Sequence, residues 1–378
     1  MRSPSWTFEN TTGAPHSKTL RLNLVTISVR EKASWKGEAV PAALLMKKDL
    51  TSWIGSLIDA YAVYGPKPKG NNFAFERIHS PEEIVLDYST TILPLKKFLS
   101  PPYEAILRFG EGRVQSLPEA GEASKTLLFG VHPCDASSFA VLDMVFINEN
   151  RDDRYVKRRE NIVTVVVVCS EPRETCFCLS MGTGPSLERG YDVLLTDLGD
   201  RYLLESGSPE GDAIIQMIPI GTVPGPADFE RKKRSIEDTL KKFKRKIVTD
   251  RLPELFRKNL DNPMWNHIRD IDLACGQCVL VCPTCYCFDI RDTSEVTSAN
   301  GERVREWDCC VLLEFAEVAM GGNFRKDRGA RIRQFMGHNL SYCIEQFGRF
   351  KCVGCGRCIE ACPVHIDVTE VASKVRGG

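Results

Sequence analysis

The segment CVGCGRCIEACP (352–363) decides how the C-terminal part of this 378-residue chain is interpreted. Three cysteines spaced by two residues, and a fourth directly before a proline, are typical of a cubane iron–sulfur cluster, in which each iron binds a thiolate. In proteins with two such clusters, the cysteine before the proline binds the other cluster. A structural zinc knuckle is the alternative, but the complete four-cysteine run and its proline favour iron and sulfide.

A second cysteine run lies upstream, at Cys275, Cys278 and Cys282, and ends before Pro283. Aligned from the proline backwards, it repeats the first run, except that Asp272 occupies the first cysteine position. The two runs therefore predict a pair of [4Fe-4S] clusters with crossed ligands. The predicted sets are Cys352, Cys355, Cys358 and Cys282 for one cluster, and Cys275, Cys278 and Cys362 for the other.

The fourth ligand at the Asp272 corner stays open between the aspartate and a nearby thiol. A carboxylate is a harder and weaker ligand for cluster iron than a thiolate, so this corner is easily lost, which would leave a [3Fe-4S] cluster. Candidate thiols are Cys285, Cys287 and Cys310. We favour Cys310, because Cys285 and Cys287 follow Cys282 closely, where the chain should be leaving toward the other cluster.

Residues 1–220 are predicted to form an α/β domain. The apolar segment 127–131 and the strongly β-branched segment 162–168 predict buried strands, and residues 137–146 between them have helical spacing. Residues 191–195 and 201–205 predict further strands, and residues 50–64 predict an amphipathic helix.

Residues 221–226 are rich in glycine and proline and form the best linker candidate. After them, an apolar stripe predicts a helix over 229–247, and the strand signals fade toward the C-terminus. The expected fold class is therefore α+β, with an N-terminal α/β domain (1–220) and a mainly helical, expanded dicluster ferredoxin domain (227–378).

Four more cysteines lie in the N-terminal domain. Cys134 and Cys169 follow the two strongest predicted strands, and open α/β sheets gather ligands at the carboxyl ends of their strands. Cys176 and Cys178 lie on the next loop. If the four thiols converge, they suffice for a third iron–sulfur cluster; a purely structural role is the alternative.

Composition excludes several classes of protein. The chain is 43% apolar and 26% charged, and its 50 basic residues balance 50 acidic ones, so no overall field favours nucleic acid. The longest apolar run, residues 162–169, is too short to span a membrane, and residues 1–18 lack the apolar core of a signal peptide. We therefore expect a cytoplasmic protein, in which 16 grouped cysteines favour metal ligation over disulfides.

Seven segments together carry a resemblance to a known family. They are LPLKKF (93–98), GVHPCD (130–135), CFC (176–178), DLACGQCVLVCPTCYCF (272–288), REWDCC (305–310), GGNFR (321–325) and CVGCGRC (352–358). In these segments the chain resembles the family of sulfhydrogenase beta subunits and of the corresponding iron–sulfur subunits of anaerobic sulfite reductase. The resemblance extends over nearly the whole chain and departs from the family pattern at Asp272, where a cysteine is common.

The resemblance implies an iron–sulfur electron-transfer subunit with two kinds of partner: a flavin- and NAD(P)-binding subunit on one side, and a catalytic redox subunit on the other. In the family, the catalytic partner is a nickel–iron hydrogenase, a sulfite or sulfur reductase, or a heterodisulfide reductase, and ferredoxin is a further candidate partner. The alternative is a self-contained reductase whose N-terminal domain binds substrate or flavin. No glycine-rich dinucleotide motif follows a strand, because Gly110-Glu-Gly112 and Gly182-Thr-Gly184 both lack the third glycine, and this favours the electron-transfer subunit.

Overall fold

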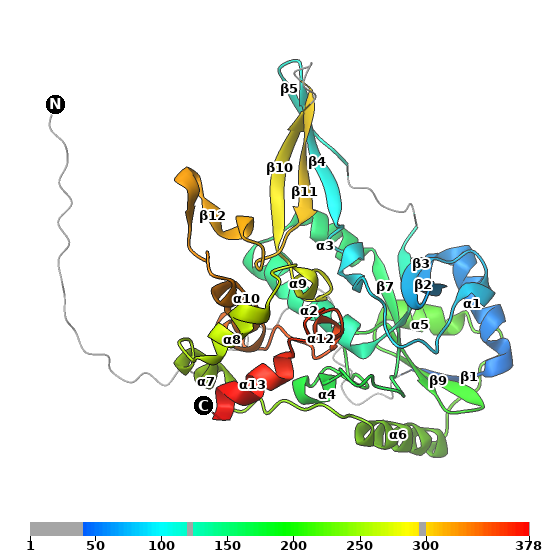
Figure 1. The fold of residues 1–378 in the computed structure, drawn as a ribbon. Coiled ribbons are helices and arrows are strands. Elements are labelled where there is room, and N and C mark those ends of the chain that lie inside the picture. Colours follow the sequence, from blue (N-terminus) through cyan, green and yellow to red (C-terminus); the bar gives the residue numbers. More distant parts are fainter. Residues whose placement is uncertain (1–40, 119–123, 295–299, 378) are drawn as a thin grey trace, which may run out of the picture. The chain divides into compact units, whose positions relative to one another are not determined.

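The computed structural model describes residues 41–118, 124–294 and 300–377. All the described residues belong to one compact unit. The α+β fold class is confirmed, with a sheet-based N-terminal part and helices around the C-terminal cysteine runs (Figure 1). The domain boundaries at residues 220 and 227 stay a prediction.

Within the described residues, the largest sheet has seven strands. Its central strands β2, β6, β7 and β8 run parallel, whereas β1, β9 and β3 pair antiparallel. Their order is β1 (Ala42–Met46), β9 (Arg201–Ser206), β8 (Val193–Asp197), β7 (Ile162–Val167), β6 (Thr126–Val131), β2 (Ala62–Lys69) and β3 (Asn72–Arg77). The strands predicted from residues 127–131, 162–168, 191–195 and 201–205 are β6, β7, β8 and β9.

Helices cover both faces of this sheet, which explains why its central strands are continuously apolar. Successive side chains of a strand point to opposite faces. Leu127 and Phe129 therefore pack with Trp53 of α1 (Leu50–Ala60) and with α5 (Pro209–Gln216). Leu128 packs on the other face with Phe139 of α2 (Pro133–Asp143) and with α3 (Asp153–Glu160). A π-helical turn, Met144–Glu149, continues α2.

A second sheet joins the two halves of the described chain. It is antiparallel, in the order β10 (Phe288–Ser294), β11 (Gly301–Trp307), β4 (Tyr103–Gly110) and β5 (Arg113–Ser116) (Figure 1). Our expectation that strands fade after residue 227 is wrong for β10 and β11. β10 is exposed along its length and both strands carry alternating charged residues, so hydrophobicity gave little signal. β11 lies between β10 and β4 and pairs with both.

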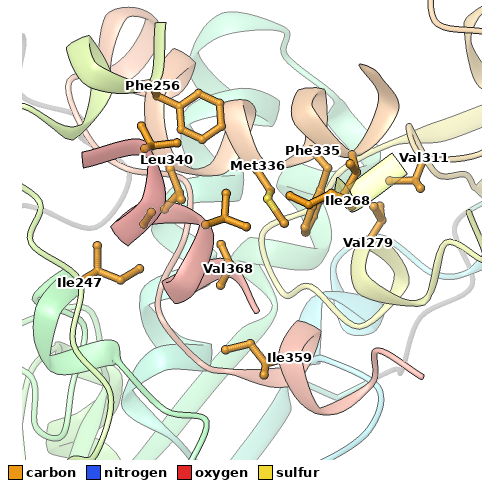
Figure 2. Close-up of a cluster of buried hydrophobic side chains, with 14 of the residues drawn as sticks. Ile247, Phe256, Ile268, Val279, Val311, Phe335, Met336, Leu340, Ile359 and Val368 are labelled. Carbon is orange, nitrogen blue, oxygen red and sulfur yellow. The ribbon is translucent and has the colours of Figure 1, made fainter. Parts of the chain in front are cut away.

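Short helices around one apolar core make up the rest of the C-terminal half. They are α7 (Leu252–Lys258), α8 (Met264–Ile271), α9 (Gln277–Leu280), α10 (Arg328–Gly337), a π-helical segment (His338–Tyr342), α11 (Cys343–Phe347), α12 (Arg357–Glu360) and α13 (Val368–Gly377). Figure 2 shows side chains from most of these helices facing a common interior. A short 3-10 turn at Glu314–Ala316 precedes the small hairpin of β12 (Glu317–Val318) and β13 (Gly322–Asn323), and a second, Ala319–Gly321, connects its two strands.

Two predicted helices end earlier than expected. The helix predicted over 50–64 ends at Ala60, and β2 begins at Ala62. The helix predicted over 229–247 is α6 (Pro226–Lys241), and Ile247 is buried in an extended segment, where its N–H donates to Ser180 Oγ. Phe243 and Ile247 are apolar because they are buried in the core, and their spacing happens to match that of a helix. In the described residues, no helix has the length and apolarity needed to cross a membrane.

A buried carboxylate holds the second sheet to α3. Glu104 of β4 accepts hydrogen bonds from Arg154 at 2.8 Å and from Arg305 at 2.9 Å, and it also pairs with Arg158. Burial alone would raise the pKa of Glu104, but the Arg158, Arg154 and Arg305 guanidinium groups outweigh burial and lower it. The arginines come from α3 and β11, so one side chain fixes three elements.

We expect Glu104→Ala to lower the free energy of unfolding by ~3–5 kcal/mol, because it leaves buried arginine charges without their partner. Glu302→Ala on the neighbouring strand is the matched control. It removes a largely exposed pair with Arg108 and should cost at most ~1 kcal/mol. Chemical denaturation measures both, and equal losses would contradict the assigned role of Glu104.

Candidate metal centres

Two neighbouring cavities are lined by the cysteines of the two C-terminal runs. The first, here called the Cys275 cavity, is lined by Asp272, Cys275, Cys278, Cys358 and Cys362 together with apolar side chains. The second, the Cys282 cavity, is lined by Cys282, Cys352, Cys355 and Cys358, again with apolar side chains. The structure thus brings together the thiols that crossed ligation predicts, and Cys358 lies between the cavities.

The two runs repeat one backbone conformation. Gly276 and Gly356 have positive φ, 76° and 75°, and each directly precedes a one-turn helix, α9 or α12. This conformation is costly for residues with a side chain, which explains why glycine occupies both positions. Main-chain amides point at the sulfurs: Gly354 N–H donates to Cys352 Sγ, and Ile366 N–H donates to Cys362 Sγ, both at 3.3 Å. Such amides stabilise thiolate charge.

The residues present fit iron–sulfur clusters. Within the described ranges, no three His, Cys, Asp or Glu side chains lie close enough to hold a single metal ion. A cubane binds its ligands at separate irons, so its thiolates surround a space, as they do in both cavities. Asp272 Oδ2, at the Cys275 cavity, is buried and has no hydrogen-bond partner in the described part of the chain. A buried polar atom without a partner is costly, and a metal ligand role would satisfy it.

Cys310, the thiol favoured from sequence for the Asp272 corner, is not among the residues that line the Cys275 cavity. Its thiol lies within hydrogen-bonding reach of Cys287, and this contact, more than burial, raises the pKa of Cys310. The same contact lowers the pKa of Cys287 to about 6. The Cys285 thiol likewise lies within hydrogen-bonding reach of the Cys282 thiol.

The four N-terminal cysteines lie within electrostatic reach of one another or of a common neighbour. Cys134 begins α2 after β6, and Cys169 follows β7, the parallel neighbour of β6. Burial raises the pKa of Cys178, and the nearby Cys176 and Cys169 thiols raise it further. Burial likewise raises the pKa of Cys134, which lies within electrostatic reach of Cys355 and Cys178. We call Cys134, Cys169, Cys176 and Cys178 the N-terminal thiol set.

The loop of the first motif packs directly on the N-terminal thiol set. Phe177 N–H donates to Gly354 O at 2.9 Å, and Arg173 Nη2 donates to Cys355 O at 2.7 Å. A Cβ atom at Gly354 would lie 2.6 Å from Cys178 N. The N-terminal set therefore adjoins the Cys282 cavity through backbone contacts.

Four buried charged side chains near these sites were not predicted from the sequence. Arg357 donates to both carboxylate oxygens of Asp135, at 2.8 and 2.7 Å, and joins the first motif to α2. Lys351 and Lys96 are buried beside the thiols of Cys282 and Cys285. Lys351 directly precedes Cys352, so its sequence position could have indicated a role. Lys96 and Asp135 are distant in the sequence and approach the 352–363 segment only in the folded chain.

Comparison with known proteins agrees with this geometry. Residues 272–366 match the family model described as a 4Fe-4S dicluster domain, which supports iron–sulfur clusters in this part of the chain. Sulfhydrogenase 2 subunit beta of Pyrococcus furiosus is 35% identical over 320 residues, which cover 84% of this chain and 92% of that protein. The chain therefore belongs to the sulfhydrogenase beta subunit family, and the resemblance found in the sequence is confirmed. No solved structure matches the chain significantly.

We expect Gly354→Ala to lower the iron bound per chain, because the new Cβ would collide with the backbone of Cys178 and separate the two cysteine loops. Gly348→Ala is the matched control. Its φ of +70° is similar, but no atom lies within 4 Å of the new Cβ, so it should lose only ~1–2 kcal/mol of stability. Iron analysis after anaerobic reconstitution measures both, and equal iron in the two variants would contradict the close approach.

Proposed function

We propose that this chain is the electron-transfer subunit of a larger oxidoreductase. It passes electrons between two partners, a flavin- and NAD(P)-binding subunit on one side and a catalytic redox subunit on the other. The observation that carries the proposal is the contiguity of the Cys275 cavity, the Cys282 cavity and the N-terminal thiol set. When bound, an iron–sulfur cluster takes up and releases single electrons. Three adjoining sites suit conduction better than chemistry on a substrate.

The proposed ligands of the first cluster are Cys282, Cys352, Cys355 and Cys358, which line one cavity. For the second, Cys275, Cys278 and Cys362 line the other cavity together with Asp272. We assign the fourth corner to Asp272 in place of Cys310, because the aspartate lines the cavity with an oxygen that lacks a partner. A third cluster in the N-terminal thiol set is supported by the convergence of its four cysteines.

Exposure supports an entry or exit point at the Cys275 cavity. Cys275 is exposed, and so is Leu273, another residue of the cavity wall, at 56%. Cys355, at the Cys282 cavity, is buried, and the N-terminal thiol set lies beyond it. A partner subunit that covers Leu273 would bring its own cofactor near the Cys275 cavity, and ferredoxin is a further candidate at the same edge.

Partner subunits are supported by the name of the Pyrococcus relative, which calls that protein a subunit of a sulfhydrogenase. Sulfur, sulfite, heterodisulfide and proton reduction all remain open as the reaction of the catalytic subunit. Purification of the native complex and identification of its other subunits would decide among them.

The chain purified anaerobically should be brown and bind about seven irons or more. Cys178→Ala should lose about four irons if the N-terminal thiol set holds a cubane. Cys343→Ala, which changes another buried cysteine outside all three sets, should lose none.

The wild-type chain should show no flavin absorption band and no oxidation of NADH. Fewer than about four irons per chain would refute the proposal, and NADH turnover or a flavin band would favour the self-contained reductase.

A second experiment concerns Asp272. We expect Asp272→Ala to give a three-iron EPR signal in the oxidised protein, because the corner iron loses its protein ligand. Asp272→Cys should restore a four-iron cluster, since a thiolate is the stronger ligand. Cys310→Ala is the control and should keep the wild-type spectrum. The opposite pattern, with the three-iron signal in Cys310→Ala alone, would return the corner to Cys310.

A further inference from the structure

Two buried lysine side chains lie within electrostatic reach of Cys282, one of the residues that line the Cys282 cavity. Lys351 is 1% exposed; its Nζ lies 3.6 Å from Cys285 Sγ and 4.5 Å from the centre of the Tyr286 ring. Lys96 is 4% exposed; its Nζ donates to Cys285 O at 2.9 Å and lies 4.1 Å from the centre of the Trp307 ring. Each lysine contacts Cys285, and the Cys285 N–H donates a hydrogen bond to Cys282 O at 3.3 Å.

Neither ammonium has an acidic partner. Among the described residues, no carboxylate lies within ion-pair distance of Lys351 or Lys96, whereas the equally buried Arg357 is paired with Asp135. The groups that face the lysines are thiols, aromatic rings and the His338 imidazole, whose Nδ1 lies 3.3 Å from Lys351 Nζ. A buried charge without a partner of opposite sign is strongly unfavourable. The arrangement therefore calls for an anion close by.

A cluster held by four thiolates is such an anion, and its negative charge grows when it is reduced. Lys351 precedes the predicted ligand Cys352 in the chain, and both lysines lie within electrostatic reach of Cys282. Nearby positive charge stabilises the more negative, reduced state and so raises the reduction potential. The Cys275 cavity has the Asp272 carboxylate instead, which favours the oxidised state.

We propose that Lys351 and Lys96 set the reduction potential of the cluster bound by Cys282, Cys352, Cys355 and Cys358 and make it the highest of the chain's clusters. This inference rests on the proposed function, because it requires a cluster at that site. Electrons would then collect at the site that lies between the exposed Cys275 cavity and the N-terminal thiol set.

The test is a potentiometric titration of the reconstituted full chain, followed by EPR. The signal that Cys355→Ala removes identifies the cluster at the Cys282 cavity, and in the wild-type chain it should have the highest midpoint. In Lys351→Met the ratio of reduced to oxidised cluster, poised at the wild-type midpoint, should fall at least tenfold, which is a shift of about 59 mV for one electron. Lys351→Arg keeps the charge and should retain most of the potential.

Lys97→Met is the matched control for Lys96→Met. Lys97 lies on the same 3-10 turn, but its Nζ donates to Phe75 O at 2.7 Å and faces no thiol. Lys96→Met should lower the same midpoint as Lys351→Met, and Lys97→Met should leave it unchanged. If Lys351→Met fails to bind the cluster, Lys96→Met decides alone.

The outcomes separate the two proposals. A wild-type chain without a cluster at the Cys282 cavity refutes the proposed function. A chain that keeps the cluster, but whose midpoint does not change in the methionine variants, overturns the role of the lysines. A higher wild-type midpoint at the Cys275 cavity also overturns the proposed order of potentials.

Discussion

The buried ion pair between Arg357 and Asp135 is the contact on which the arrangement of the cysteine sites depends. Arg357 lies between Cys355 and Cys358, and Asp135 directly follows Cys134, so one bidentate pair fixes the first C-terminal run against the N-terminal thiol set. Arg357 also donates to Thr91 O at 2.8 Å. Burial alone would lower the pKa of Arg357, but the neighbouring Asp135 carboxylate outweighs burial and raises it. Removing one partner of such a pair costs ~3–5 kcal/mol, so the two cysteine sets fold as one site.

Charge is distributed unevenly around the three cysteine sites. At the N-terminal thiol set, the positive charge of Arg357 is cancelled by Asp135. At the Cys275 cavity the Asp272 carboxylate is buried, and burial raises its pKa. At the Cys282 cavity two ammonium groups have no carboxylate partner in the described residues. Similar cysteine runs therefore lie in different electrostatic environments, which are set by residues outside the cysteine pattern.

Local patterns predicted what depends on neighbouring residues in the chain. The parallel strands β6 and β7, with Cys134 and Cys169 after them, could be inferred from apolar runs. The spacing before Pro283 and Pro363 indicated which cysteines line the same cavity. The hairpin of β10 and β11 could not, because its partner β4 lies about two hundred residues away in the sequence and its exposed face is highly charged. The position of Cys310 beside Cys287 depends on the same hairpin, which joins the two cysteines.

The hairpin also explains why the Cys310 thiol does not line the Cys275 cavity. Phe288 of β10 pairs with Trp307 of β11, so the segments that carry Cys287 and Cys310 are held side by side at the base of the second sheet. That sheet is fixed to α3 through Glu104 and Arg305. The Cys310 thiol would have to leave Cys287 to reach the Cys275 cavity, whereas the Cys309 thiol already lies 3.7 Å from Gly276 O. The carboxylate of Asp272 needs no such movement, because it already lines the cavity.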